Sequence, residues 1–378
     1  MRAFRLLEQF QKVMERVEAK FPPPPTFSDP RRRLELSQYL SLFLFGLFNP
    51  VLDSMRGLCA ATEIKSVQEI SGGKVSLGSF SEIQHVIDLA FLKAVMEELI
   101  EEVQRRAPEA RDAFRWRVVD SSVFAVVQRM GWAHFQTHNG VPQSAIRLHV
   151  TYDLMLGVPC QAVVAKAKVG EQKIWQTQWD KEMGEIGDRN YSLDYKLLDR
   201  LDEMGGFFLV RLREKSFNFE VEEEMPLSPE DEKANIIRQA WGRLGKERPR
   251  QKVRVIWIRM NSGEVLALAT NQGVEKLPGH AAGELYRKRW QVELFFRWVK
   301  CIFKCRHFLA ESENGVAIQL YLALIAALII QLYTGSRPNK RTMEMLQWYS
   351  MGMVKPEELE DFLVKQQRII FKKSKQAK

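Results

Sequence analysis

The sequence changes from helical to strand patterning at Arg115–Asp120, which reads RWRVVD. Short apolar segments with the two-residue alternation of strands follow it along the chain. These segments are 123–127, 146–153 (IRLHVTYD) and 158–169, with turns expected at Asn139-Gly140 and Leu156-Gly157. Consecutive strands joined by tight turns predict an antiparallel meander.

A helix and a further strand extend this part of the chain. Residues 193–203 (LDYKLLDRLDE) predict the helix, and 207–212 (FFLVRL) predict a buried strand. Strands followed by a helix and a strand predict a mixed α/β domain. By composition, the intervening residues 181–187 (KEMGEIG) make a poor strand.

Strand patterning returns after an acidic stretch. Residues 220–232 carry seven acidic side chains around two prolines and predict a solvated loop or a short exposed helix. Residues 252–260 (KVRVIWIRM) and 265–270 (VLALAT) then flank Asn261-Ser262-Gly263, which is typical of a hairpin. This part therefore reads as a β-rich insertion within the α/β domain.

The first hundred residues are helical in pattern. Helices are expected at 1–20 and 31–48, with a polyproline-like break at Pro22–Pro25 between them. A short helix is expected at 67–70, and Ser79-Phe80-Ser81-Glu82 has capping-box spacing ahead of a long helix at 82–106. Two interpretations stay open for 66–106. It is either a pair of core helices joined by a glycine turn or a DNA-binding tri-helical element with few nearby cations.

Composition limits the class of protein. The chain has 378 residues, and its 56 basic and 47 acidic residues give a net charge of +9, which permits a polyanionic partner. Four cysteines are too few for a disulfide scaffold, so a reducing compartment is expected. No signal peptide is predicted, and the apolar run 320–330 is too short for a membrane span of about 18 residues. A buried helix in a soluble, cytoplasmic protein without membrane partners is expected.

The informative stretch for chemistry is 285–300, LYRKRWQVELFFRWVK. On one continuous helix, Tyr286, Arg289, Glu293 and Lys300 share a narrow stripe, opposite a set of apolar residues. A carboxylate flanked by cations and a phenol suits a metal-bound phosphate, with the carboxylate binding a hard cation. The alternative is an ordinary surface salt bridge between Arg289 and Glu293.

Two aspartates are the candidate partners of Glu293. Asp120 ends the RWRVVD segment, and Asp188 lies in GDRNY ahead of the helix at 193–203. A strand end is a rigid place for a metal ligand. Each aspartate has the alternative interpretation of a turn residue, and Asp153 competes for the same role.

These residues carry a resemblance. The spacing Tyr286-x2-Arg289-x3-Glu293-x6-Lys300 resembles the YREK signature of bacterial insertion-sequence DDE transposases of the IS-four family. The segments at Asp120-Ser121-Ser122, 188–215 and 311–332 are similar to other blocks of that family. The resemblance implies an α/β fold with an RNase H-like mixed sheet and flanking helices. A β-rich insertion interrupts that domain, and an all-α N-terminal region precedes it.

The resemblance also implies limits for the parts of the chain. These are a helical N-terminal region for binding transposon ends (1–110), the first part of the catalytic domain (111–213), the β-rich insertion (214–280), the last part of the catalytic domain (281–335), and a C-terminal helical region with a basic tail (336–378).

The implied activity is metal-dependent DNA cleavage at insertion-sequence ends and strand transfer into target DNA. Asp120, Asp188 and Glu293 would hold two Mg²⁺ ions, for which Mn²⁺ can substitute. Tyr286, Arg289 and Lys300 would contact DNA phosphates. A homodimer on DNA and a bacterial, nucleoid-associated location are also implied. The alternatives are a domesticated DNA-binding derivative and a stand-alone nuclease.

Two further features are weighed from the residues themselves. Trp257, on the hairpin of the insertion, is a candidate for stacking on an extruded base, with core packing expected for Trp298. Cys301-x3-Cys305-x-His307 has only three possible zinc ligands, so buried helix cysteines are expected instead.

Overall fold

The computed structural model describes residues 5–21, 34–107, 115–138, 141–177, 183–213, 217–245, 252–305, 307–335, 337 and 339–376. The chain forms two compact units. Unit 1 comprises Met1–Pro108, Phe124–Ile146 and Phe296–Lys378, and unit 2 comprises Glu109–Val123 and Arg147–Phe295. The turn expected at Asn139-Gly140 and the break at Pro22–Pro25 lie outside the described residues.

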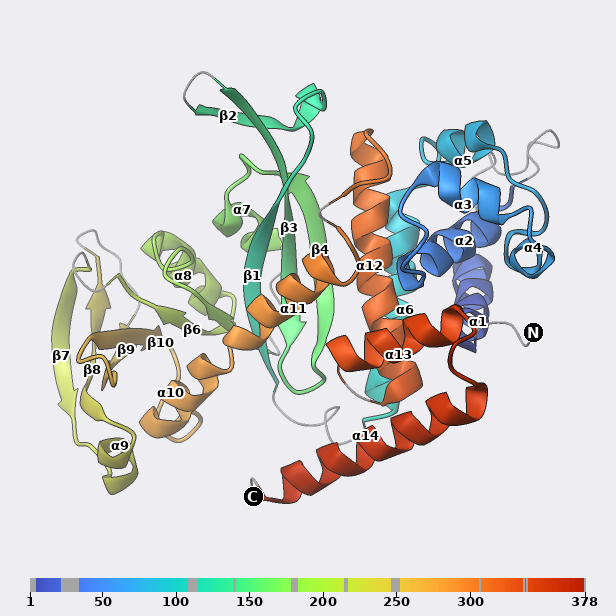
Figure 1. Ribbon diagram of the computed structural model, residues 1–378. Helices are drawn as coiled ribbons and strands as arrows, with labels where there is room; N and C mark the ends of the chain where they lie inside the picture. The colour runs from blue at the N-terminus through green and yellow to red at the C-terminus, as the bar shows by residue number, and fades with distance from the viewer. Residues whose placement is uncertain are drawn as a thin grey trace. The chain divides into compact units, whose positions relative to one another are not determined.

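Unit 1 is built mainly from helices (Figure 1). Their bounds are α1 (Arg5–Lys20), α2 (Leu36–Phe48), α3 (Met55–Ala61), α4 (Lys65–Ser71), α5 (Leu77–Ile83), α6 (Leu89–Arg105), α12 (Glu313–Thr334), α13 (Lys340–Ser350) and α14 (Pro356–Gln376). A 3₁₀ turn at Gly131–Ala133 and the strand β2 (His134–His138) complete it, and β2 pairs antiparallel with the start of β3 (Val141–Asp153).

Helix α12 forms the centre of unit 1. It packs against α1, α2 and α6, and Ser312 caps its first turn by accepting a hydrogen bond from Gly315 N. The helix is long and apolar enough to cross a membrane by length and composition, but 94% of its most apolar window is buried within the protein. The prediction of a buried helix at this apolar run is therefore confirmed.

The long helix predicted at 82–106 is wrong. Two helices, α5 and α6, lie there, because this stretch contains two helix N-caps rather than one. Ser76, not Ser79, caps α5 by accepting from Ser79 N at 3.1 Å, and Asp88 caps α6 by accepting from Ala90 N at 2.9 Å. Phe80 on α5 is fully buried against the ring of Tyr39, so the short helix belongs to the core of unit 1.

Unit 2 contains a large mixed sheet with flanking helices (Figure 1). Its strands are β1 (Trp116–Ala125), β3, β4 (Val158–Lys166), β5 (Gly184–Gly187), β6 (Phe207–Arg211), β7 (Phe219–Met225), β8 (Ile236–Leu244), β9 (Lys252–Arg259) and β10 (Val265–Thr270). The helices are α7 (Glu171–Thr177), α8 (Tyr195–Glu203), α9 (Pro229–Lys233), α10 (Gly279–Arg287) and the first half of α11 (Trp290–Cys301).

The strand order within unit 2 is β3-β1-β5-β6-β10-β9-β8-β7, and β4 pairs with β3. Backbone hydrogen bonds from Leu154 N to the Trp116 carbonyl and from Val126 N to the Ser144 carbonyl fix β3 antiparallel to β1. On the other side of β1, strands β5 and β6 run parallel to it. Antiparallel and parallel pairing in one sheet is the mixed sheet that the resemblance implied, so the predicted fold class is confirmed.

Strands β7 to β10 form an antiparallel meander that continues this same sheet through the pairing of β10 with β6. The predicted hairpin at Asn261-Ser262-Gly263 is confirmed, and Gly263 has a positive φ of 85°. The residue limits predicted for the separate parts of the chain stay predictions.

The loop predicted for the acidic stretch is wrong in its first half. Glu220–Glu224 lie on the edge strand β7, because basic side chains of β8 and β9 neutralise them. Glu224 pairs with Arg238, Glu222 with Arg243, and Glu223 with Lys252 at 3.4 Å. The second half contains the short helix α9, and a short helix was one of the two predicted alternatives.

Candidate active site

The two aspartates come from neighbouring parallel strands. Strand β1 pairs with β5 in an unbroken register from Trp116↔Gly184 to Val118↔Ile186. The same register, continued along both chains, reaches Asp120 on β1 and Asp188 directly after β5. The two aspartates therefore stand opposite each other on neighbouring strands, which lie about 4.8 Å apart.

Strand β5 exists despite its poor composition because its glycines allow close packing. All four of its residues are buried. A Cβ on Gly184 would lie 2.4 Å from the Trp116 indole, and one on Gly187 would lie 2.8 Å from the Tyr191 side chain. Larger residues would push β5 away from its neighbours, so the weak strand formers at these positions are required by the fold.

Asp120 lies within β1 and not at its end as predicted, since the strand continues through Ser121 and Ser122 to Ala125. Its side chain is only 15% exposed, and Oδ1 accepts a hydrogen bond of 2.7 Å from Ser121 N. Burial raises the pKa of Asp120 to about 7, against the Ser121 hydrogen bond and the charge of Arg289. The carboxylates of Asp188 and Glu171 raise that pKa further.

Asp188 begins the turn that follows β5. Its Oδ1 accepts a hydrogen bond of 2.8 Å from Asn190 N, so the expected role of a turn residue is also realised. The two roles are compatible, because one carboxylate oxygen can hold the turn while the other stays available to a ligand.

Arg289 joins Asp120 to Glu293. Its Nη1 lies 3.2 Å from Asp120 Oδ2, and its Nη2 donates to Glu293 Oε1. The guanidinium also lies 5.9 Å from the centre of the Tyr286 ring. Three residues of the predicted stripe, Tyr286, Arg289 and Glu293, are thereby brought together with Asp120 in unit 2.

The single continuous helix predicted for these residues is wrong. Helix α10 ends at Arg287 and α11 begins at Trp290, so Arg289 lies in the junction. Tight hydrogen bonds, from Arg289 N to the Tyr286 carbonyl and from Val292 N to the Arg289 carbonyl, close this junction. The junction turns Arg289 toward β1 while Glu293 stays in the first turn of α11.

Lys300 lies on α11 beyond Glu293, in the half of the helix that belongs to unit 1. Its ammonium lies 4.9 Å from the ring of Phe124 in the same unit. Asp153, the competing aspartate, is buried and pairs with Arg115 at 3.3 Å, and its Oδ1 holds the turn at 155–156.

Three side chains near Asp120 were not found from the sequence. Glu171 opens α7, accepts a hydrogen bond from Ser121 Oγ and pairs with Arg147 of β3 at 2.7 Å. Tyr191 is buried beside the turn of Asp188. A single glutamate and a single arginine carry no spacing signal, so only the fold reveals them.

The tryptophans have separate surroundings. Trp257 is half-buried on β9, with the Phe219 ring 5.7 Å away and the Arg238 guanidinium 4.6 Å from its centre. Base stacking by Trp257 stays a prediction. Trp298 is buried, as expected, and Trp290 at the start of α11 is 52% exposed.

A cavity of about 620 Å³ in unit 2 adjoins this site. Tyr286 and Arg289 line it together with further cations and the exposed Trp290. The cationic lining residues are Arg211, Lys233, Arg287 and Arg289. The cavity therefore brings several cations near Arg289, together with the acids Glu264 and Glu284.

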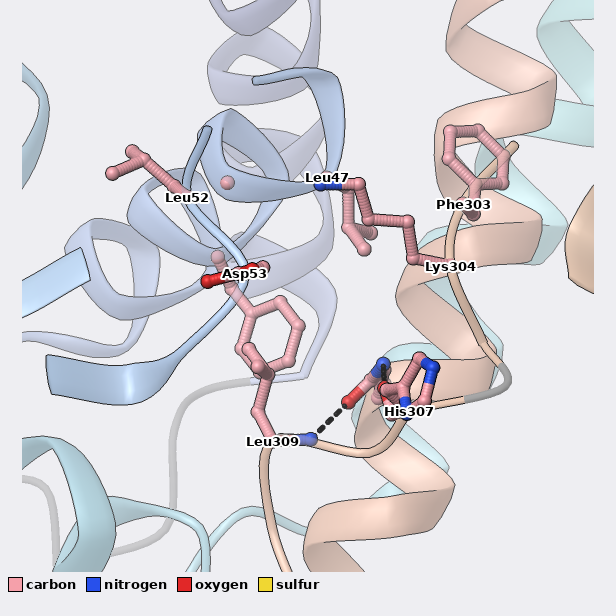
Figure 2. Close-up of a pocket in the computed structure, with 10 residues that line it drawn as sticks. Leu47, Leu52, Asp53, Phe303, Lys304, His307 and Leu309 are labelled. Carbon is pink, nitrogen blue, oxygen red and sulfur yellow. Dashed lines mark hydrogen bonds between the residues drawn. The ribbon is translucent and has the colours of Figure 1, made fainter. Parts of the chain in front are cut away.

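A second cavity, of about 480 Å³, lies in unit 1 between α2 and the loop 303–309 (Figure 2). The polar side chains that line this cavity make hydrogen bonds to the protein backbone. Lys304 Nζ donates to the Pro50 carbonyl at 2.6 Å, and the Gln319 amide bonds Leu309 N and the His307 carbonyl. None of the predicted site residues lines this cavity.

The donor set of the site suits a hard divalent cation, since all three predicted ligands are carboxylates. Among the described residues no three His, Cys, Asp or Glu side chains are gathered closely enough to hold a metal ion. Asp120 and Glu293 share the Arg289 guanidinium instead. The pKa of Asp120 is raised first by burial, and the nearby carboxylates of Asp188 and Glu171 raise it further against the Ser121 hydrogen bond and the charge of Arg289.

The cysteines do not form a zinc site in the part of the chain that the structure describes. Cys305 is buried, but in a turn beyond α11, and Cys301 at the end of α11 is exposed. The expectation that both are buried helix cysteines is therefore wrong for each in one respect.

Comparisons with known proteins show the family of this chain. The family described as "Transposase DDE domain" matches residues 112–329, which is more than half of the chain. This chain therefore belongs to the DDE transposase family. The matched region contains Asp120, Asp188 and Glu293.

Relatives in bacteria are named as transposases. The chain is 28% identical over 61% of its length to y4zB of Sinorhizobium fredii, and 25% identical over 57% to the protein of insertion sequence element IS5377 of Geobacillus stearothermophilus. It is 22% identical over 89% to the protein of element IS4SA of Synechocystis, of which 92% is covered. The alignments span 64% and 55% of the first two relatives. The predicted relationship to insertion-sequence transposases is thereby confirmed at the level of the family.

Among solved structures, the chain is similar to a piggyBac transposase in a synaptic complex with hairpin DNA. The identity is 10%, the TM-score is 0.42, and 96% of this chain and 84% of that chain are covered. A likeness of this size supports no inference about function.

Proposed function

We propose that this chain is a DDE transposase of the IS-four type, with Tyr286, Arg289, Glu293 and Lys300 as its YREK signature. It cuts DNA at the ends of its insertion sequence and joins those ends to target DNA, using Mg²⁺, for which Mn²⁺ can substitute. The observation that carries the proposal is the register of β1 with β5, which brings Asp120 opposite Asp188 on adjacent parallel strands.

Asp120, Asp188 and Glu293 would hold two divalent cations. When bound, such a pair generates a nucleophile at neutral pH and stabilises the charge on both sides of a displaced phosphodiester. Three carboxylates offset much of that positive charge, and the DNA phosphate offsets more. No nucleophilic side chain is required, which agrees with a site made of acids, an arginine and a tyrosine.

Arg289 would have two partners in turn. In the structure it pairs with Asp120 and Glu293, whose carboxylates are partly accessible. Carboxylates that bind a cation no longer need this partner, and a guanidinium binds phosphate oxygens through the same two nitrogens. Tyr286 would orient a phosphate beside it, and Lys300 would contact the DNA backbone further along α11.

The cavity beside Tyr286 and Arg289 offers a path for the DNA strand. Its cations, Arg211, Lys233 and Arg287, extend the positive charge away from the carboxylates. Phosphate contacts of this kind position nucleic acid without reading its sequence. Recognition of the insertion-sequence ends then requires other surfaces, for which the helical N-terminal region is proposed.

The partners follow from the reaction. Two ends must be held together for insertion at one target, so a homodimer on DNA is proposed. A net charge of +9 favours association with nucleic acid, and we propose a cytoplasmic, nucleoid-associated location in bacteria. The relatives named as transposases of insertion sequence elements support the proposal that this chain acts on the ends of such an element.

The test uses a plasmid that carries this reading frame with its natural flanking DNA. The purified protein is incubated with the plasmid and Mg²⁺, Mn²⁺ or a chelator. Divalent-ion-dependent cuts at two inverted repeats, followed by transfer of a labelled 3′ end to a second plasmid, are expected. Cleavage without end transfer would identify a stand-alone nuclease. Binding to the repeats without cleavage in either ion would identify a DNA-binding derivative, and both results would overturn the proposal.

A further inference from the structure

Helix α7 reaches both aspartate-bearing segments through its first two residues. The Glu171 carboxylate accepts from Ser121 Oγ on β1 and from Arg147 Nη1 at 2.7 Å. The next side chain, Gln172, donates from Nε2 to the Asn190 carbonyl at 2.7 Å. Two adjacent residues of one helix are thus bonded to segments that lie far apart in sequence, one on β1 and the other after β5.

Each of these bonds is one residue removed from a catalytic carboxylate. Ser121, which bonds Glu171 through its hydroxyl, also donates its backbone N–H to Asp120 Oδ1 at 2.7 Å. Asn190, which bonds Gln172 through its carbonyl, also donates its backbone N–H to Asp188 Oδ1 at 2.8 Å. Two parallel chains of hydrogen bonds therefore run from α7, one to each aspartate.

The far end of α7 is anchored in the core of unit 2. Trp175 is 2% exposed, its Nε1 donates to Glu185 on β5, and its ring meets Tyr191 edge-on at 5.2 Å between centres. Glu185 in turn pairs with Arg117 of β1. A shift of α7 would break these buried contacts, so the helix is a rigid support for the two chains.

The Glu171 carboxylate is occupied by its protein partners. Its side chain is 14% exposed and pairs with both Arg147 and Ser121. Its bond to Ser121 therefore links it to the Asp120 carboxylate.

We propose that Glu171 and Gln172 are positioning residues, which set the separation of the Asp120 and Asp188 carboxylates for the paired divalent cations. This inference rests on the proposed function of the site. The physical need is clear, because two like charges on adjacent strands repel each other and Mg²⁺ demands near-ideal octahedral ligand geometry. Fixed neighbours limit how far the two aspartate carboxylates can move apart when a cation binds.

The first experiment measures Mn²⁺ binding to the full chain without DNA, from the electron paramagnetic resonance signal of free Mn²⁺. Gln172→Met keeps the size of the side chain and removes the donor to Asn190. Glu171→Met removes the acceptor of Ser121, whereas Glu171→Gln retains an acceptor oxygen. Lys173→Ala, on the exposed side of the same helix, is the matched control.

Gln172→Met and Glu171→Met are expected to raise the Kd for Mn²⁺ by roughly 10-fold, the lower end of the loss usual for outer-shell partners. Glu171→Gln should recover much of the affinity, and Lys173→Ala should match the wild type. Thermal unfolding of each variant identifies a protein that has lost its fold. If one variant at position 171 or 172 fails to fold, the other carries the test.

The second readout is the ratio of DNA cleavage rates in Mg²⁺ and Mn²⁺. A loosened site should lose more activity with Mg²⁺, which tolerates distorted geometry least, so the ratio should fall. A folded Gln172→Met protein with wild-type Kd and ratio would overturn the positioning role, provided Asp120→Asn lowers Mn²⁺ affinity. If Asp120→Asn binds Mn²⁺ as the wild type does, the proposed metal site itself fails, and the positioning role fails with it.

Discussion

Arg117 and Asp120 lie close together on β1, yet their ionic surroundings differ. Arg117 is 3% exposed and pairs with the fully buried Glu185, whose other oxygen accepts from Trp175. Asp120 and Glu293 share one arginine, and Asp188 and Glu171 add further negative charge nearby. The first group, here called the closed pair, is buried and has balanced charge, whereas the second holds more acid than base.

The two groups therefore have different roles, one structural and one functional, although Arg117 and Asp120 lie on the same strand. A closed buried pair contributes to the unique pairing of β1 with β5, because either charge alone would be stranded in the core. In the second group the carboxylates outnumber the cations, and the pKa of Asp120 is raised there, mainly through burial. The surplus marks the place where a cation is expected.

The largest expected effect is on DNA cleavage by acid-to-amide variants. Asp120→Asn, Asp188→Asn and Glu293→Gln should each lower the rate by about 10³-fold or more, above the roughly 10- to 100-fold loss usual for outer-shell partners. The measurement is nicking of the plasmid with its natural flanks in Mg²⁺. Glu203→Gln, an exposed acid on α8, is the control. Any of the three that cuts at the wild-type rate is no metal ligand.

Removing one charge of the closed pair, Arg117 and Glu185, should lower the stability of the protein. Arg117→Met leaves Glu185 charged and buried, and is expected to lower the free energy of unfolding by about 3–5 kcal/mol. Urea unfolding of the full chain measures this loss. The double variant Arg117→Met, Glu185→Leu removes both charges, so it should be more stable than the single variant. A single variant as stable as the wild type would show that the pair is not closed.

Arg289 tests the same comparison in the acid-rich group around Asp120. Arg289→Met should change the free energy of unfolding by less than about 1 kcal/mol, because the surrounding carboxylates can be solvated or protonated. The same variant should slow cleavage by roughly 10²-fold, as for the loss of one group that stabilises developing charge. Arg289→Lys keeps the charge without the two-pronged geometry and should recover only part of the rate. A loss of stability as large as that of Arg117→Met would remove the distinction.

The smallest effect concerns pH. The pKa of Asp120 is raised from 3.8 to about 7, first by burial, so the protonated form stabilises the fold. This contribution is fully present below pH 3.8 and is lost as pH rises through 7. Asp120→Asn cannot ionise. The melting temperature of this variant minus that of the wild type should therefore increase between pH 5 and pH 9. A constant difference over this range would show that the Asp120 pKa is not raised.

Sequence patterns predicted the family and the fold class better than they predicted the local scaffold of the candidate site. The spacing of Tyr286, Arg289, Glu293 and Lys300 led to the family, which the family match confirms, whereas the roles of Asp120, Asp188 and Glu293 stay predictions. Strand β5 was missed, since Gly184 and Gly187 are selected for close approach to Trp116 and Tyr191 and not for strand propensity. That requirement depends on tertiary neighbours, which are invisible along the chain.

Local rules also failed where two elements meet. Helical periodicity placed Tyr286, Arg289 and Glu293 correctly on one side, but the junction at Arg289 was missed because no Pro or Gly marks it. The edge strand β7 was missed because its glutamates are neutralised by Arg238 and Arg243, which come later in sequence. The role of Glu171 rests on hydrogen bonds to Ser121 and Arg147 and has no local signature.

The most direct test is a crystal of the full chain soaked in Mn²⁺, with anomalous scattering used to locate the ions. Density about 2.1 Å from carboxylate oxygens of Asp120 and Asp188, with Glu293 completing the set and Arg289 turned away, is the expected result. Mn²⁺ bound only at other acids, with Arg289 still bridging Asp120 and Glu293, would contradict the proposed catalytic centre.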